Sequence, residues 1–167
     1  GLMSAYFTYI YEKINAFFKK LSSPWLRIVV GGALLGLLIY IMPPLYGEGH
    51  EIINHLKEGH PELSLSSNIF GWDLSNAWVI ILLLAALTFA KVVATSLTFG
   101  AGGVGGIFSP MLFMGGVMGN CLAWIINEFP ILGYKAALPN FTLVGMTALM
   151  TGVLHAPLTA VFLIAEV

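Results

Sequence analysis

The sequence predicts an all-α integral membrane protein with broken and tilted helices. Of its 167 residues, 58% are hydrophobic and only 9% are charged, whereas soluble domains carry about 25% charged residues. Such a chain has too few polar residues to cover a surface in water, so lipid is its expected solvent. Between Lys91 and Glu128 no residue is charged, and glycines interrupt this apolar run at 100–106. The run is too long for one span of about 20 residues and too short for two, which predicts partial helices.

The composition also excludes several classes of protein. The net charge of -1 gives no basic face for nucleic acid. The single cysteine, Cys121, excludes an intramolecular disulfide, and its apolar neighbours indicate a packing role. No nucleophile, carboxylate pair or cofactor loop is recognisable, so we expect neither an enzyme nor a bound cofactor. The sequence begins with Gly1 rather than Met and ends at Val167 within an apolar run, so we expect a piece of a longer protein.

Two helices are expected before residue 43. Residues 1–21 carry aromatic and aliphatic residues at helical spacing and end with a charged segment, which indicates a helix leaving the membrane. Ser23 as N-cap and Pro24 at the first position then begin a span that runs from Trp25 to Met42. Small residues in this span permit close helix contact in lipid, as a pairing motif or as general packing: Gly31, Gly32 and Gly36.

The long polar stretch at residues 45–75 is expected to be a loop with a short helix in "EGHEIINHLKEGH". Its three histidines, His50, His55 and His60, are either metal ligands or chance members of a solvated loop. A spacing of five residues turns each histidine by about 140° around a helix, so three on one helix cannot face a single ion. The solvated loop is therefore the favoured interpretation.

The charges predict an orientation in the membrane. Four basic residues lie on one side of the 25–42 span: Lys13, Lys19, Lys20 and Arg27. The other side, residues 45–62, is acidic and rich in histidine, with one lysine. Because cytoplasmic loops carry an excess of Lys and Arg, we expect the 13–27 turn in the cytoplasm and the 45–75 loop outside. The protein is thus expected to cross the cell membrane several times.

Further helices are expected on both sides of the glycines at 100–106. Trp78 to Phe99 is long enough to cross a bilayer. After the glycines, Ser109 as cap and Pro110 in the first turn are expected to begin a helix that continues through "MLFMGGVMGNCLAWII". Methionines on one face of that helix indicate packing rather than a site: Met111, Met114 and Met118.

The last apolar piece runs from Phe141 to Val167, with interruptions expected at Gly152 and at "HAP", residues 155–157. His155 is there either an interfacial histidine with satisfied hydrogen bonds, which we favour, or part of a proton relay. Lys91, the lone charge of a long span, either raises the local potential for anions or has a structural role near a helix end, and the structural role is favoured.

The glycine-rich break leaves two alternatives open. Lipid cannot hydrogen-bond to backbone, so irregular chain at membrane depth must face protein or a wet cavity. The first N–H groups of the following helix lack intrahelical acceptors and lie at the positive end of the helix dipole. Glycines beside them let an ion approach the backbone, which favours an uncharged anion site without lysine or arginine. The same glycines are equally typical of a tight helix crossing.

Three elements resemble the CLC family of chloride channels and proton-coupled chloride transporters, in the family's order. They are "PLYGEGHE", like its Gly-rich turn, "GAGGVGGIFSP", like its G-x-F-x-P element, and "GMTALMTGVLHAPLTAVFLIAE", like its later A-P-L-T segment. The resemblance implies that residues 1–167 are one half of an inverted-repeat transporter: a single membrane domain, the second repeat, incomplete at its C-terminal end. The first repeat, a second copy in a homodimer, the bilayer and chloride are then the expected partners.

The resemblance also implies an anion site. In the family, backbone amides of the isoleucine and phenylalanine of the G-x-F-x-P element contact the anion, and here these are Ile107 and Phe108. Gly106, Ser109 and Pro110 flank them. The family's G-S-G-I-P serine element, its G-K/R-E-G-P gating glutamate element and its late-helix tyrosine do not occur in this sequence. Channel or proton-coupled antiporter therefore stays open, as does the preference among anions.

An alternative function follows from the same absences. Because half of the family's anion ligands are missing, the 167 residues alone are either part of a transporter or a transport-incompetent membrane assembly domain. The helix after "HAPLT" belongs to the dimer face of the family, which is what a dimerisation domain would use.

Overall fold

The computed structural model describes residues 1–47, 49–58, 76–129 and 135–166, and these residues form helices and connections without a strand. In chain order the elements are α1 (Leu2–Lys19), α2 (Pro24–Ile41), the short 3-10 helix η1 (Pro43–Leu45), α3 (His50–Glu58), α5 (Ala77–Gly100), α6 (Phe108–Glu128), α7 (Leu138–Leu154) and α8 (Pro157–Ala165). The prediction of an all-α protein is confirmed.

Three helices in the described parts of the chain are long and apolar enough to cross a membrane: α2, α5 and α6. α7 is apolar but shorter. About half or more of the α5 and α6 windows is buried inside the molecule, whereas only 6% of the α2 window is. α2 therefore lies at the edge of the bundle with its apolar side chains exposed, as expected for a helix that contacts lipid.

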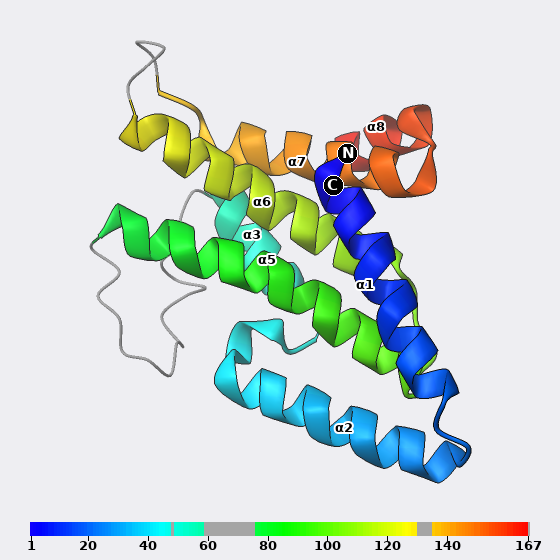
Figure 1. Cartoon of the computed structure of the whole chain (residues 1–167). Coiled ribbons are helices and arrows are strands. Elements are labelled where there is room, and N and C mark those ends of the chain that lie inside the picture. Colours follow the sequence, from blue (N-terminus) through cyan, green and yellow to red (C-terminus); the bar gives the residue numbers. More distant parts are fainter. Residues whose placement is uncertain (48, 59–75, 130–134, 167) are drawn as a thin grey trace.

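The bundle is layered around α6, which lies between α5 and α7, with α2 beyond α5 at the lower edge of Figure 1. α1 crosses α5, and aromatic rings join them: Tyr6 meets Phe89 at 5.1 Å and Tyr11 meets Phe99 at 5.9 Å between ring centroids. α8 turns back from the end of α7. The core gathers along α6, where Phe113, among others, is fully buried.

α6 and α7 approach each other through glycines. A Cβ atom on Gly115 or Gly119 of α6, or on Gly145 of α7, would collide with the backbone of the opposite helix. Small residues let helix backbones come this close in a membrane protein. A buried hydrogen bond of 3.1 Å, from Asn120 Nδ2 to Thr142 Oγ1, joins the same two helices. Gly115 and Gly119 of α6 therefore belong to a tight helix crossing with α7.

Most expected boundaries in the first half are confirmed. Ser23 is the N-cap of α2 and Pro24 its first residue, although the Ser23 side chain makes no capping hydrogen bond. The short helix expected within 45–75 is α3. His50 and His55 belong to α3, whereas His60 lies outside the described residues.

Two expectations for the last apolar piece are wrong. α7 begins at Leu138, before Phe141, because Pro139 is well placed in a first helical turn. α7 also continues through Gly152, since a single glycine costs a helix only about 1 kcal/mol and this one packs against Ser4.

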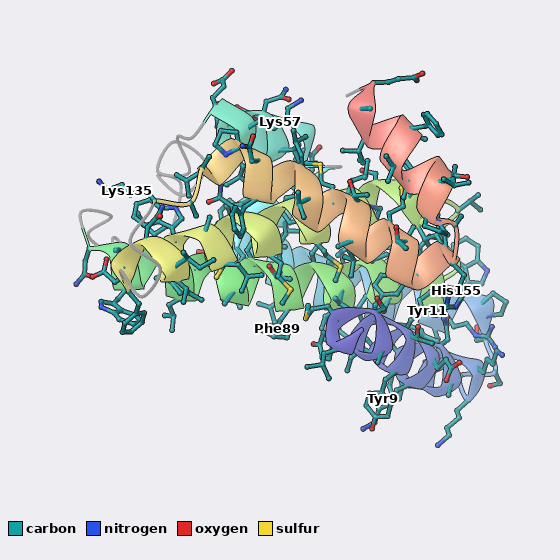
Figure 2. The ribbon with its side chains drawn as sticks, turned by 90° about the horizontal axis from the view of Figure 1, so that it is seen from above. Tyr9, Tyr11, Lys57, Phe89, Lys135 and His155 are labelled. Atoms are coloured by element: carbon teal, nitrogen blue, oxygen red, sulfur yellow. The ribbon has the colours of Figure 1, made fainter. Side chains whose placement is uncertain are left out.

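The break expected at residues 155–157 is confirmed. His155 caps α7 in the left-handed region with a φ of 55°. Pro157 then begins α8 and disfavours helical backbone at the residue before it. Figure 2 shows Lys135 and His155 toward opposite ends of the molecule, with Tyr11 of α1 near the His155 end.

Candidate functional site

The helical run breaks between α5 and α6, and residues 102–106 of the connection are exposed in the described chain. α5 ends at Gly100, α6 begins at Phe108, and the residues between them have no regular structure. The end of α5 is closed by backbone bonds, among them Gly103 N–H to the Thr98 carbonyl oxygen at 2.8 Å. Gly102 has a φ of 99°, which glycine adopts without steric cost.

The break lies beside the interior of α2. A Cβ atom on Gly31, in the middle of α2, would collide with the Ala101 side chain, and one on Gly100 would collide with the Phe18 ring. α2 is apolar and long enough to span a membrane. Irregular backbone beside its middle must therefore face protein or a wet cavity.

The start of α6 differs from the prediction. Ser109 is not the cap: the N-cap is Ile107, whose carbonyl oxygen accepts the Met111 N–H at 3.2 Å. Ser109 and Pro110 follow Phe108 as the second and third helical residues. Proline has no N–H and is tolerated in a first turn, so the helix can begin two residues before it. The N–H groups of Ile107 and Phe108 consequently lie at the helix N-terminus, where no intrahelical acceptor exists.

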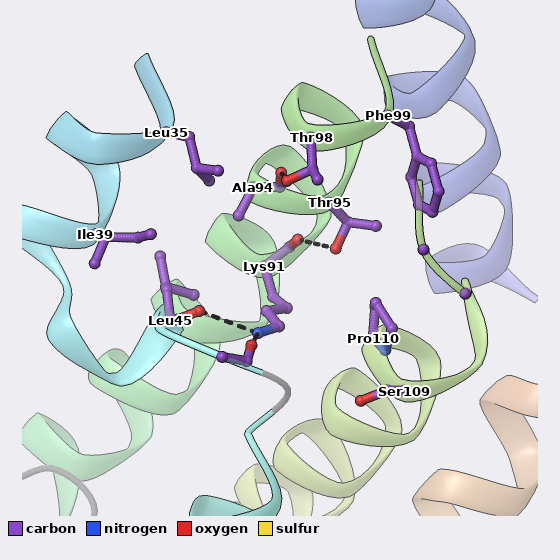
Figure 3. A pocket seen from close by; sticks show the side chains of 13 residues that line it. Leu35, Ile39, Leu45, Lys91, Ala94, Thr95, Thr98, Phe99, Ser109 and Pro110 are labelled. Atoms are coloured by element: carbon purple, nitrogen blue, oxygen red, sulfur yellow. Dashed lines mark hydrogen bonds between the residues drawn. The ribbon is translucent and has the colours of Figure 1, made fainter. Parts of the chain in front are cut away.

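A cavity of about 240 Å³ lies beside this helix start. Its walls come from α2, from η1 and the turn after it, from α5, from the α5–α6 loop and from the start of α6 (Figure 3). Of the five predicted site residues, the structure brings three to the wall: Gly106, Ser109 and Pro110. The side chains of Ile107 and Phe108 instead pack against the hydrophobic core, so any contact that they make with a ligand would come from their backbone.

Gly105 and Gly106 are not explained by packing. A Cβ atom on Gly106 would meet only the Phe108 nitrogen, at 3.9 Å, and one on Gly105 would meet nothing within 4 Å. Neither residue has a positive φ, so neither backbone conformation requires glycine. What the missing side chains do provide is free space on the cavity wall.

The threonine hydroxyls of the wall are hydrogen-bonded within α5. Thr95 Oγ1 donates to the Lys91 carbonyl oxygen at 2.8 Å, and Thr98 Oγ1 donates to the Ala94 carbonyl oxygen at 2.9 Å. A hydroxyl has one proton, and here it is already engaged along α5.

The sequence predicts an anion site without lysine or arginine in the glycine-rich break, and the cavity beside it does contain one cation. Lys91, from the middle of α5, lines the same cavity as Gly106 and is only 4% exposed. Its Nζ donates to the carbonyl oxygens of Leu45 and Gly47. The loop at residues 100–106 contains no cation, and the preceding helix α5 supplies this one. The lone charge within a long apolar span was the signal for it.

The histidines supply no metal site in the part of the chain that the structure describes. No group of three or more His, Cys, Asp or Glu residues there lies close enough to hold an ion. The question of His60 stays outside the described residues.

Comparisons with known proteins agree with the pattern of broken apolar helices. The protein-family model described as "Voltage gated chloride channel" matches residues 1–167, the whole chain. The voltage-gated ClC-type chloride channel ClcB of Salmonella dublin is 29% identical over 153 residues, which cover 91% of this chain and 32% of that protein. The ClcB channel of Citrobacter koseri matches to the same extent.

A ClcB-like chloride channel protein of Ralstonia nicotianae is 31% identical over 142 residues, covering 84% of this chain and 28% of that protein. The chain therefore spans a third or less of the length of these curated relatives. No solved structure gives a significant match.

Proposed function

Because this chain belongs to the voltage gated chloride channel family, we propose that the protein moves chloride or a similar anion across a membrane. We propose further that residues 1–167 are the second inverted repeat of a longer protein, incomplete at the C-terminal end, and that a first repeat completes the pathway. The relatives named as chloride channels are about three times as long as the region matched here, which supports this division.

The observation that carries the proposal is the helix start of α6 beside a cavity, in a break that lies against the middle of the apolar helix α2. The N–H groups of Ile107 and Phe108 lie at the positive end of α6, and Gly106 leaves the wall open next to them. Oriented amides of this kind bind anions without a full charge at the contact. The anion is thus held by the backbone of Ile107 and Phe108, with Gly106, Ser109 and Pro110 around it.

Chloride flux from liposomes tests this function. The complete protein is reconstituted in liposomes loaded with chloride, and efflux is followed with a chloride electrode after valinomycin sets the membrane potential. We expect efflux well above that of protein-free liposomes. Efflux no faster than from empty liposomes, with protein shown to be folded and inserted, would contradict the proposal.

The same liposomes separate a channel from a proton-coupled antiporter. A chloride gradient drives protons uphill through an antiporter, and a pH electrode records this, whereas a channel moves chloride alone. The residues that make this choice in the family are not in this chain, so both outcomes agree with the anion site proposed here.

The second candidate function is an assembly or dimerisation domain. α8 favours it, because three apolar side chains on this short helix are more than half exposed: Leu158, Val161 and Phe162. A second copy in a homodimer would cover them, as would lipid. Liposomes that carry only the 167-residue chain and show selective chloride flux would exclude a transport-incompetent domain, and cross-linking in mild detergent would show whether two copies associate.

The family and the apolar helices make this a membrane protein. We propose that its 13–27 turn faces the cytoplasm and its 45–75 loop the outside. The four basic residues around the α1–α2 connection support this orientation. Cysteines introduced at Lys20 and at Lys57, in a variant in which Cys121 is replaced, should react with a membrane-impermeant reagent from opposite sides.

A further inference from the structure

Lys91 has an unusual position for a charged side chain. It lies in the middle of α5, a helix that is long and apolar enough to cross a membrane, and it is only 4% exposed. Charged residues inside membrane helices are costly and are commonly functional, with partners in the protein. Packing alone would be served more cheaply by Met or Leu, so the role of the ammonium group requires an explanation.

The Lys91 ammonium binds the end of η1 and the turn that follows it. Its Nζ donates to the Leu45 carbonyl oxygen at 3.1 Å and to the Gly47 carbonyl oxygen at 2.8 Å. Figure 3 shows the side chain reaching toward the Leu45 carbonyl, with Ser109 and Pro110 across the cavity. Leu45 and Gly47 both line the cavity themselves. One wall of the cavity is therefore a turn whose carbonyls are held by a cation.

Phe113 of α6 fixes this arrangement from a second side. The Lys91 Nζ lies 4.8 Å from the centroid of the Phe113 ring, a distance typical of a cation–π contact. The same ring lies so close to Gly49 that a Cβ atom there would collide with it. Gly47 and Gly49 have φ angles of 68° and 82°, a conformation that favours glycine. The turn is thus shaped to present its carbonyl oxygens to Lys91.

We propose that Lys91 is a positioning residue of the anion cavity. By binding the carbonyl oxygens of one wall, Lys91 makes that wall compatible with a bound anion. A carbonyl oxygen is the negative end of a dipole and repels an anion. The ammonium engages the Leu45 and Gly47 oxygens and keeps them directed at itself, so that the helix N-terminus of α6 is the electrostatic feature that the anion meets. This inference rests on the proposed function.

The test compares variants of the complete protein in chloride binding, flux and stability. Lys91→Met removes the charge and its hydrogen bonds but keeps most of the apolar volume, and we expect chloride affinity to fall about tenfold or more. Lys91→Arg retains a cation and donors and should restore a large part of that loss. Calorimetry gives the affinity, liposomes give the flux, and thermal unfolding gives the folded fraction. A merely structural role would lower the unfolding temperature without moving the affinity of the folded protein.

Each result decides the inference. A folded Lys91→Met protein with chloride affinity within about twofold of wild type would overturn it while leaving the proposed function intact. A folded wild-type protein without chloride flux or binding would overturn the proposed function and this inference with it. If Lys91→Met does not fold, Gly47→Ala serves instead: its left-handed backbone disfavours alanine, so the carbonyl turns while Lys91 remains. Lower chloride affinity in a folded Gly47→Ala protein supports the inference, and unchanged affinity overturns it.

Discussion

Glycines of the α5–α6 loop and glycines of the α6–α7 crossing occupy opposite environments. Cβ atoms on Gly105 and Gly106 would meet little or nothing, and both residues line a cavity. Cβ atoms on Gly119 and Gly145 would collide with the backbone of the facing helix. Both sets lie in or against the same glycine-rich stretch of sequence, yet only the second is demanded by the packing of helices.

This difference shows that the close crossing of α6 and α7 explains only some of the glycines. Backbone atoms cannot give way as a flexible side chain can, so α6 and α7 need glycine where they touch. The loop is under no such demand at Gly106, and access to the cavity is the explanation that remains. Substitutions at the helix crossing should therefore lower the stability of the fold, whereas substitutions in the α5–α6 loop should reduce anion flux.

The largest effect is expected at the crossing. Gly119→Leu should prevent the protein from reaching its folded state, because the leucine side chain would overlap with the Phe141 carbonyl and the Gly145 backbone. Gly119→Ala, the smaller change, should lower the free energy of unfolding by about 2–3 kcal/mol, the upper range for an overpacked site. Thermal unfolding in detergent measures both variants.

Gly32→Ala is the matched control for the crossing. It also places a methyl group on a membrane helix, but nothing lies within 4 Å of its Cβ position. If Gly119→Ala unfolded at a temperature no lower than those of wild type and Gly32→Ala, the close approach of α6 and α7 would be refuted.

The next largest effect is expected for a substitution in the α5–α6 loop, which should change anion flux but not stability. Gly106→Trp should abolish anion flux, because the indole would enter the cavity of about 240 Å³ beside the α6 N-terminus. Stability should change little, since a Cβ atom on Gly106 meets no close neighbour. Liposome flux and thermal unfolding, measured on the same preparation, separate the two quantities.

Val104→Trp provides the control within the same loop. Val104 is fully exposed and is not part of the cavity wall, so flux in this variant should stay near that of wild type. Wild-type flux in Gly106→Trp would rule out a close backbone approach by the anion at this loop.

The sequence predicted the positions of the helices better than it predicted their ends and the contacts between them. Hydrophobic runs and prolines located α2, α5 and the His155 break, because these signals are local. The start of α6 was placed too late, because Ser109 looks like a cap whereas the helix can begin before a proline at its third position. The break at Gly152 was wrong because a glycine packed in a contact is tolerated within a helix.

The candidate site could be located from the sequence, but not its walls. Ile107, Phe108 and their neighbours are consecutive, so a motif is sufficient to find them. Lys91 and the Leu45 turn reach the same cavity only through packing of α5 beside α6 and η1, and no spacing in the sequence encodes that meeting. Lys91 could be singled out as the lone charge of a long apolar span, but its contact with the Leu45 carbonyl could not be predicted.

A smaller effect is expected at Pro110. Pro110→Ala adds an N–H to the first turn of α6 and leaves the helix start in place. One more donor near the anion should alter chloride flux by a factor of about two to three, in keeping with the modest energies of helix-terminus interactions. Complete loss of flux in a folded Pro110→Ala protein would instead mean that the proline itself shapes the loop.

The smallest effect is expected at Gly36. This glycine is required neither by a helix crossing, like Gly119, nor by the cavity, like Gly106. It lies in α2, and nothing would meet its Cβ atom within 4 Å. Gly36→Ala should therefore leave flux unchanged and stabilise the fold by no more than about 1 kcal/mol, because alanine is the better helix former. A loss of stability would reveal a neighbour on this face of α2 in the complete protein, either a first repeat or a second copy, and cross-linking from a cysteine at residue 36 would identify which of the two it is.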